Sequence, residues 1–502
     1  MLTYRNSLFL IVLALTDVVS AQQSISETDP LVERTSLSAK SGKLLYANPA
    51  SNILRYRSSM SRLEGFYSLE DANQPIVMQL GDGHHIAGFH TGAYLHFKNN
   101  SLVWGEAEYQ NGKRKNVQWS ETSDFMRVYP YVTADTLGGD FDKESYFFKG
   151  GYAQKIGRWS YGADMSYSSI LEHREYDPRP KNNTVYISAT VGASYHTHFD
   201  YQLGGYVYAE KYTQTQDIAF LDPLGSIPVY HMHGLGMHYA RFAGSRPDAY
   251  YTGRTFRVGA TLQPQNTTGW EAAVQMENYH LQKQLPALND APINDIAEWK
   301  LDAELSWKQK SYFVNLNGYF SSRKGKERIY DDGVSNWKEI SSTEPYSAKN
   351  MFAELKGGYE WILARQWNFQ VLPSVAFNRS QIDYKPSRKQ VIGGVNSTLA
   401  GSFRYSKGRH FLTLDLAGSY YANCMAEQSI SNPSYFKYAN KMVKHNYEML
   451  TADFWSVRTS AAYHYRMNKW INTVYLKASF VHQENNKEYH ANGFTATLGL
   501  TI

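Results

Sequence analysis

The 502-residue sequence has only one cysteine, Cys424, so no disulfide forms within the chain, and nothing marks this residue as a paired nucleophile. It has no run of about eighteen apolar residues, and its mean hydropathy of −0.51 is clearly negative, which excludes a membrane protein built from helices. Charged residues make up only 19%, below the roughly 25% of a soluble domain. The net charge of +5 is too small for this length to indicate a nucleic-acid partner.

Catalytic motifs are also missing. The sequence contains no Gly-x-Ser-x-Gly nucleophile elbow, no phosphate-binding loop and no zinc-binding helix motif. A barrel that acts as a phospholipase or protease needs a nucleophile and a base within hydrogen-bond distance, and no local signature of such a pair occurs. We therefore expect that the protein is not an enzyme. No Pro-, Gly- or Ser-rich linker divides the chain, so we expect one large folded unit.

The N-terminal residues have the features of an export signal. Arg5 supplies a positive charge, residues 8–15 form a short apolar core, and residues 19–21 are a small-residue cleavage site. The apolar run is too short to span a bilayer, which favours a signal peptide over an N-terminal anchor. We therefore divide the chain into a signal peptide (1–21), an N-terminal periplasmic or plug segment (22–60) and a barrel (61–502).

An alternation of apolar and polar residues runs through most of the chain. In residues 299–307 the odd positions are apolar or aromatic and the even positions are polar or charged, and a similar rhythm continues to residues 494–502. Soluble sandwiches and propellers also alternate. Here the polar face carries charge in almost every strand, which a dry core does not hold without pairing. We predict an all-β fold, a single antiparallel transmembrane β-barrel of about eighteen strands, with fourteen or sixteen left open.

The connections between the expected strands fall into two classes. Short turns are expected at residues 98–101, 155–158, near 198, 264–269, 308–310, 363–366, 406–409 and 467–469. Longer polar connections are expected at residues 70–85, 113–145, 170–182, 213–253, 282–296, 322–348, 380–393, 422–450 and 483–490. Short periplasmic turns and long extracellular loops are typical of a barrel in the outer membrane of a Gram-negative cell, and the 40 tyrosines and 11 tryptophans suit its two aromatic girdles.

The polar strand faces predict the lining of a lumen. The candidate selectivity residues are Glu106, Glu108, Asp164, Glu271, Glu277, Asp302, Glu304, Arg404, Asp415, Arg458 and Lys477. Rows of both signs would hydrate a channel and set a transverse field. An equally acceptable interpretation is a network of paired charges that stiffens the wall of a plugged barrel. Residues 22–60, 113–145 and 213–253 are long enough to supply a plug.

One loop is rich in soft metal ligands. His231, Met232, His233, Met237 and His238 lie close together in the connection 213–253. Imidazole with thioether suits copper, and imidazole alone suits zinc or iron, so the loop is a candidate metal or haem site. No carboxylate or cysteine completes a recognisable spacing. The alternative is a glycine-hinged aromatic loop that folds into the mouth of the barrel, with no cofactor.

Several short motifs point to known barrel families. The segment Tyr46-Ala-Asn-Pro-Ala50 resembles the N-terminal segment of fatty-acid-transporter-like outer-membrane barrels. The stretches 103–112, 134–139, 146–153 and 159–162, rich in Gly, Trp and Tyr, resemble a Bacteroidota outer-membrane barrel family of unknown function. The resemblance implies a barrel in the cell outer membrane, and it supplies neither a substrate nor catalytic residues. Fatty-acid-transporter-like barrels have fewer strands than we expect here, and their last strand often ends on an aromatic residue, whereas this chain ends on Ile502.

We expect a porin-like role, the passage or capture of a small solute. Because no plug domain of roughly a hundred residues precedes the expected barrel, passage is expected to be passive, with a role beside a separate energised receptor left open. The competing hypothesis is a non-transport partner in assembly, secretion or metal and haem acquisition. The other expected partners are outer-membrane lipid and the barrel-assembly machinery, without nucleic acid.

Overall fold

A computed structural model of the chain describes residues 29–222, 227–242, 244, 247–266, 268–331, 337–364, 366–431, 436–467 and 471–502. The expected signal peptide, residues 1–21, lies outside these residues. No helix in the described ranges is long and apolar enough to cross a membrane.

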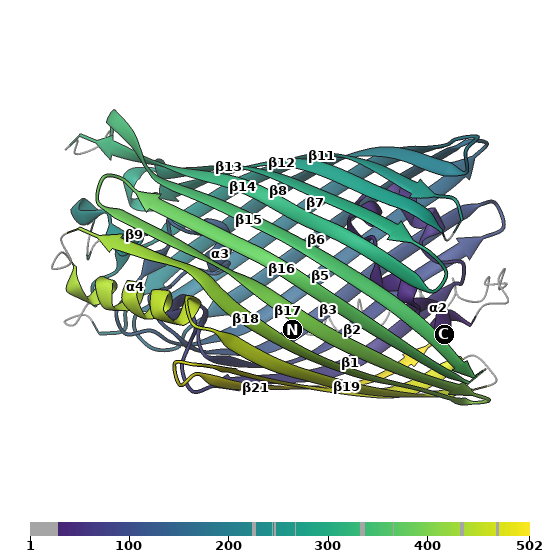
Figure 1. The fold of residues 1–502 in the computed structure, drawn as a ribbon. Helices are drawn as coiled ribbons and strands as arrows, with labels where there is room; N and C mark the ends of the chain where they lie inside the picture. Colours follow the sequence, from purple (N-terminus) through teal and green to yellow (C-terminus); the bar gives the residue numbers. More distant parts are fainter. Residues whose placement is uncertain are drawn as a thin grey trace, which may run out of the picture.

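Eighteen antiparallel strands form one closed barrel (Figure 1). Each strand pairs with its neighbours in the barrel, and β1 closes the ring by pairing with both β2 and β21. The first nine strands are β1 (Met60–Ala72), β2 (Gly83–Phe97), β3 (Ser101–Val117), β5 (Gly139–Ile156), β6 (Trp159–His173), β7 (Arg179–His196), β8 (Tyr201–Ala219), β11 (Ala249–Pro264) and β12 (Gly269–Leu285). The other nine are β13 (Ala291–Lys308), β14 (Tyr312–Tyr330), β15 (Glu339–Ala364), β16 (Trp367–Tyr384), β17 (Arg388–Lys407), β18 (His410–Ile430), β19 (Phe454–Arg466), β20 (Thr473–Asn485) and β21 (His490–Thr501). The prediction of about eighteen strands is confirmed, and seven of the eight expected short turns lie between consecutive strands. The eighth, expected at residues 467–469, lies mostly outside the described residues.

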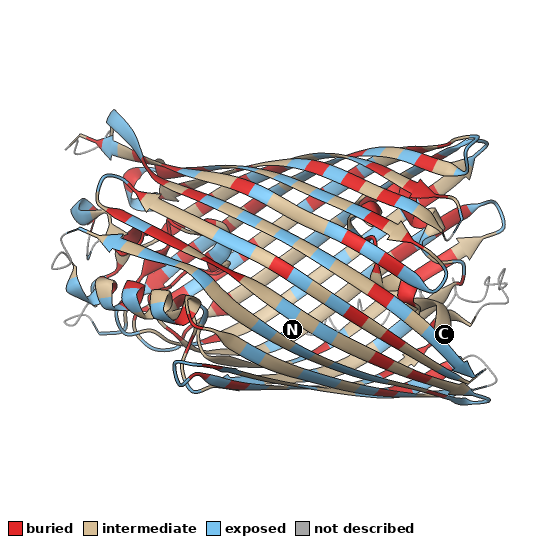
Figure 2. Cartoon of the chain, viewed as in Figure 1, coloured by how far each residue is buried: buried red, intermediate tan, exposed pale blue. Residues whose placement is uncertain are grey.

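The alternation in the sequence sorts side chains between the outer wall and the lumen, which gives the chequered strands of Figure 2. On β13, Trp299, Leu301 and Leu305 are exposed on the outside, with relative exposures of 53%, 50% and 44%. Trp299 and Trp307 lie eight residues apart on this face, about 26 Å along the strand. This length matches the apolar band of about 25 Å, flanked by aromatic residues, that lipid requires.

The strands extend beyond the apolar belt on the side of the long connections. On β12 the outward positions change from Val274 and Met276 to Asn278, His280 and Gln282. Several expected loops are therefore largely strand, which corrects the prediction; for example, only residues 385–387 separate β16 from β17, where 380–393 was expected to be a loop. The outward face of these extensions is polar, so the apolar alternation of a membrane strand is lost there although the backbone still pairs.

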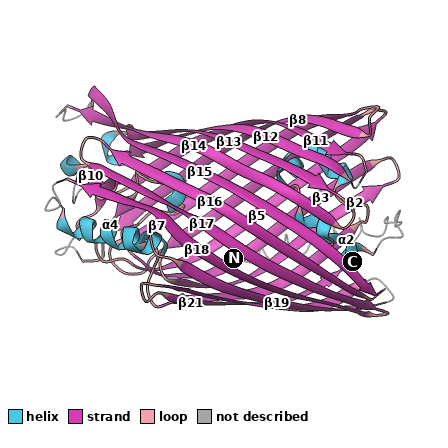
Figure 3. Ribbon diagram, viewed as in Figure 1, coloured by secondary structure: helices cyan, strands magenta, loops and turns pink. Residues whose placement is uncertain are grey.

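Short elements lie at the two ends of the barrel (Figure 3). Residues 29–58, which we call the N-terminal segment, contain α2 (Pro30–Thr35), η1 (Leu37–Lys40), η2 (Lys43–Ala47) and η3 (Pro49–Leu54) and lie at the short-turn end. The long connections contain η4 (Met78–Leu80), α3 (Phe125–Val128), β4 (Thr133–Ala134), β9 (Tyr230–Gly234), β10 (Met237–His238), η5 (Ala240–Phe242), η6 (Pro286–Leu288) and α4 (Lys437–Leu450). Strands β4, β9 and β10 pair as a separate three-stranded sheet.

Candidate functional site

The N-terminal segment lies inside the barrel and is held by polar contacts with the wall. Its short helices contact strands from β3 around the ring to β15. Arg404 on β17 donates to the carbonyl oxygen of Val32 at 3.2 Å and to Thr35 Oγ1 at 2.9 Å. Glu304 on β13 accepts the backbone N–H of Leu44 at 2.7 Å. The bonds to Val32 and Leu44 satisfy backbone groups that short helices leave open.

Asn48 fixes the segment to a patch of inward-facing glycines on three adjacent strands, Gly162, Gly192 and Gly204, which we call the glycine socket. The Asn48 amide is fully buried; its oxygen accepts the N–H of Ala50 at 3.0 Å, and its nitrogen donates to Ser194 Oγ at 3.2 Å. A Cβ on Gly162 would lie 2.5 Å from the backbone nitrogen of Ala50, and Cβ atoms on the other two glycines would collide with the Asn48 amide. The socket therefore accepts Asn-Pro-Ala only because these three positions have no side chain.

The opposite end of the lumen is filled by residues 118–138, residues 227–242 and α4, which we call the loop plug. Its apolar side chains and the inward wall of the barrel form one buried cluster, which includes Trp119, Phe125, Tyr131, Met232, Phe242 and Val443 from the plug and Tyr212, Tyr251, Tyr279 and Leu281 from the wall. Arg323 on β14 donates to the carbonyl oxygens of Met126 at 3.1 Å and Tyr129 at 2.7 Å. The cluster lies within the part of the barrel that extends beyond the apolar belt, since Tyr279 follows Met276 on β12.

A fully buried ion cluster joins the loop plug to the barrel. Arg174, just after β6, donates to Glu121 at 2.7 Å and to Asp135 at 2.5 Å, and all three side chains have 0% exposure. The Glu121 carbonyl oxygen also accepts from Asn182 at 2.8 Å and from Gln216 at 2.7 Å. Removal of one partner from such a cluster would leave a buried charge uncompensated, which is strongly destabilising. The cluster therefore holds the loop plug against the barrel at this point.

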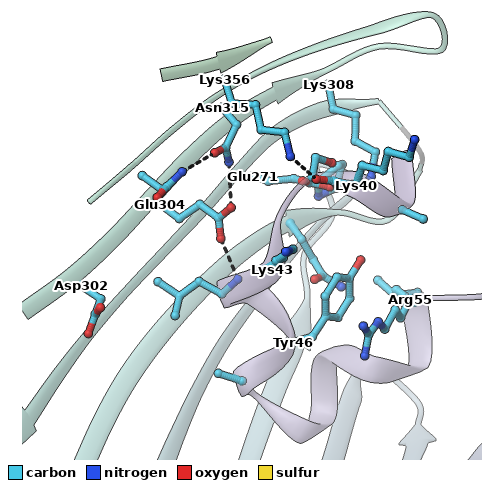
Figure 4. A pocket seen from close by; sticks show the side chains of 18 of the residues that line it. Lys40, Lys43, Tyr46, Arg55, Glu271, Asp302, Glu304, Lys308, Asn315 and Lys356 are labelled. Atoms are coloured by element: carbon cyan, nitrogen blue, oxygen red, sulfur yellow. Dashed lines mark hydrogen bonds and ion pairs between the residues drawn. The ribbon is translucent and has the colours of Figure 1, made fainter. Parts of the chain in front are cut away.

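A lower chamber of about 1460 Å³ lies between the N-terminal segment and strands β11–β15 (Figure 4). It reaches from Gln265 at a short turn to Tyr319 and Phe352, next to the outward Phe320 and Met351 at the far edge of the belt. Its charged lining is mixed: Lys40, Lys43, Arg55, Arg57, Arg257, Lys308 and Lys356 with Glu33, Glu271, Asp302, Glu304 and Glu354. Burial lowers the pKa of the Lys40 ammonium.

An upper chamber of about 720 Å³ lies between the loop plug and strands β14–β20. Tyr319 lines both chambers, so they meet at this side chain. Its ring stacks on Phe352, with centroids 5.7 Å apart and planes at 19°, and Lys300 Nζ lies 4.6 Å from the ring centre. The lumen thus contains two chambers in series, with an aromatic pair at their boundary.

The eleven candidate lumen residues occupy inward strand positions and fall into several groups. Glu271, Asp302 and Glu304 share the lower chamber, where Glu271 pairs with Lys308 at 3.1 Å. Arg404 holds α2, and Asp415 lies near enough to Lys40 to influence its charge. The remaining candidates lie on the wall outside the lower chamber. Three of them have polar partners: Glu277 pairs with Arg257, Asp164 with Lys149 and Glu108 with Gln110. The other three lie on the inward faces of their strands: Glu106 with Trp104, Arg458 with Ser456 and Lys477 with Tyr475.

Several residues around the lower chamber were not among the candidates predicted from the sequence. Lys308 and Lys356 line the lower chamber, and Tyr319 marks its boundary. Lys308 extends the polar face of residues 299–307 by one step, a signal that was readable. No signal in the sequence marked the glycine socket, because its three glycines lie far apart in the chain and glycine occurs on both strand faces.

The histidine- and methionine-rich loop forms part of the loop plug. His233 Nδ1 lies 3.1 Å from Glu327 Oε2, and its ring meets Tyr131 edge to face at 5.5 Å. His238 packs on Tyr230 and Phe436, while Met232 joins the apolar cluster. His231 is fully buried and Met237 is half-buried on β10. Within the described ranges, no three His, Cys, Asp or Glu side chains are grouped so as to hold a metal ion.

Comparison with known proteins gives a family and a set of distant structural likenesses. Residues 49–502 match a family described as a family of unknown function (DUF6850). A variant of the ferric enterobactin receptor from Pseudomonas aeruginosa is similar at 9% identity and a TM-score of 0.41, over 88% of this chain and 80% of that chain. The ferric preacinetobactin receptor (9% identity, TM-score 0.39, 88% and 80%) and the siderophore receptor PiuA (6%, 0.37, 88% and 82%), both from Acinetobacter baumannii, are similar to the same degree. No curated protein matches the chain.

Proposed function

The chain belongs to a family of unknown function, and we propose from its geometry that it is an outer-membrane barrel that admits a small hydrophilic solute into its lumen and passes it across the membrane. The exposed apolar belt with aromatic edges supports the location, because such an outer wall is stable only against hydrocarbon. The expected signal peptide agrees with export. The proposal includes no catalytic step.

The lower chamber is the observation that carries the proposal. It crosses the level of the apolar belt beside the N-terminal segment, and at least twelve charged side chains line it. Apolar solutes gain nothing from such a lining, whereas a hydrophilic solute exchanges hydration water for charged and polar groups. Since Tyr319 lines both chambers, we infer one interior route along β14 that passes this side chain.

We infer that passage is passive and is limited by the N-terminal segment and by the Tyr319–Phe352 pair. The segment fills part of the lumen, so the remaining lower chamber sets the size of the solute. The mixed charges set its polarity, because an ion of either sign meets like charges as well as opposite ones.

Liposome swelling tests the proposal. Liposomes that contain the folded full-length protein should swell faster in small hydrophilic solutes than liposomes with the same amount of heat-denatured protein, and the rate should fall as solute size increases. Because no energy source is present, swelling also tests whether passage is passive. Equal rates for folded and denatured protein would refute the proposal.

One observation favours a second candidate, a partner barrel that does not transport. The loop plug and the N-terminal segment occupy both ends of the lumen, and the wall extends beyond the belt as a rim suited to a second protein. Single-channel recordings in a planar bilayer separate the two candidates. Conductance steps support passage, and silence supports the partner role.

A further inference from the structure

The two chambers differ sharply in charge. Carboxylates and cations mix in the lower chamber, whereas no Asp, Glu, Lys or His is among the residues described around the upper one. Two arginines border the upper chamber. Arg323 is occupied by Glu298 at 2.6 Å and by two carbonyl oxygens of the loop plug, and Arg379 lies on the outward strand face in line with Val375.

A polar band crosses the wall of the upper chamber on six neighbouring strands, β15 to β20. It consists of Asn350, Asn378, Asn396, Ser419, Ser456 and Gln483. The strand register places Ser419 opposite Ser456 and Ser456 opposite Gln483, so the band is continuous there. Amides and hydroxyls both donate and accept hydrogen bonds, and none of them carries a charge.

The amides keep hydrogen-bonding capacity for a ligand. Asn350 donates through its nitrogen to Ser321 at 3.3 Å, and Asn396 donates through its nitrogen to Thr398 at 3.4 Å. Among the described residues, these are the hydrogen bonds of both side chains, so their carbonyl oxygens remain available as acceptors. Gln390 accepts from Gln428 at 3.0 Å, which leaves its amide nitrogen as a donor.

The opposite wall of the chamber is apolar apart from Gln79 and Asn446, which are hydrogen-bonded to each other at 2.8 Å. Phe125, Leu235, Met442 and Val443 from the loop plug face the polar band across the space. Tyr129 and Tyr346 add an aromatic pair, edge to face at 6.0 Å. A ligand that fits must present hydroxyl groups on one side and C–H groups on another, without a net charge that the chamber does not balance.

We propose that the upper chamber binds a neutral, hydroxyl-rich solute of the saccharide class. A sugar ring has hydroxyls at its edge, which both donate and accept, and C–H faces that pack on apolar and aromatic side chains. The chamber volume of about 720 Å³ lies within the range of roughly 300–1,000 Å³ typical of small-molecule sites. The inference rests on the proposed function, in that the lumen admits a solute, and adds its chemical class.

Calorimetric titration of the detergent-solubilised full-length protein tests the inference without any measurement of passage. The probes are glucose, maltose and maltotriose, with lysine, glutamate and triglycine as comparators. We expect at least one saccharide to bind and the charged comparators not to bind. Binding of lysine, glutamate or triglycine in preference to all three saccharides, or binding of none of the six, overturns the assignment.

A pair of variants locates the bound saccharide. Asn350→Ala together with Asn396→Ala removes two acceptors from the band and should weaken binding about tenfold. The matched control, Asn278→Ala, removes an amide from the outer face of the extended wall and should bind as the parent does. Heat-modifiable mobility in electrophoresis shows that each barrel is folded. Undiminished binding by the folded double variant also overturns the assignment, whereas swelling without saccharide binding leaves the proposed function standing.

Discussion

The segments at the two ends of the lumen are held by different kinds of contact. The N-terminal segment meets the wall through hydrogen bonds, the glycine socket and small apolar contacts such as Leu37 against Phe313. The loop plug shares one large buried cluster with the wall and adds a fully buried ion cluster. Because apolar burial contributes most of the stability of packed segments, the loop plug should be bound to the wall more firmly than the N-terminal segment. The N-terminal segment depends on fewer contacts, each with a defined geometry.

The glycine socket offers the largest expected effect. Gly162→Val places a side chain where the backbone of Ala50 now lies, so the N-terminal segment cannot dock, and liposome swelling should increase several-fold. Gly418→Val is the matched control, because no atom lies within 4 Å of a Cβ at that strand position. An unchanged swelling rate in a folded Gly162→Val barrel would show that the segment does not limit passage.

The buried ion cluster tests the other closure. Arg174→Met leaves Glu121 and Asp135 buried without their cation, which should weaken loop-plug docking by about 3–5 kcal/mol. Protease added to the folded barrel should then cut within residues 118–138 much faster than in the parent. Arg158→Met, at an exposed arginine beside His198, should be cut at the parent rate. If protease cuts both variants at the parent rate, the ion cluster does not hold the loop plug in place.

A smaller effect is expected from pH at the loop plug. Burial lowers the pKa of His238 to about 4, and the neighbouring His233 and Arg388 act in the same direction. An undocked histidine titrates near 6.5, so between about 6.5 and 4 the undocked form binds more protons, and docking weakens as pH falls through this window. Hydrogen-exchange protection of residues 230–238, after correction for the intrinsic pH dependence of amide exchange, should therefore be lower at pH 5 than at pH 7, and His238→Phe should reduce the difference. An equal difference in that variant would assign the effect to other groups.

Strand alternation predicts the face on which a side chain lies, and it does not predict which distant residue that side chain contacts. Alternation assigns Glu304 and Leu305 to opposite faces because side-chain direction in a strand depends only on the local backbone. It does not say that Glu304 accepts the N–H of Leu44, which lies 260 residues away in the sequence. Similarly, Asn350 and Asn396 read as ordinary polar positions until the register brings their strands around one chamber.

The sequence by itself determined a closed barrel of about eighteen strands and its apolar belt, because these follow from a two-residue period repeated along the chain and from short turns between strands, whereas the structure fixed the number at eighteen. It also marked the histidine-rich connection as unusual. Only the tertiary structure decided which connections fill the lumen, where the two chambers meet and which glycines receive Asn48. These features depend on contacts between residues far apart in the chain, and such contacts exist only once the ring of strands has closed.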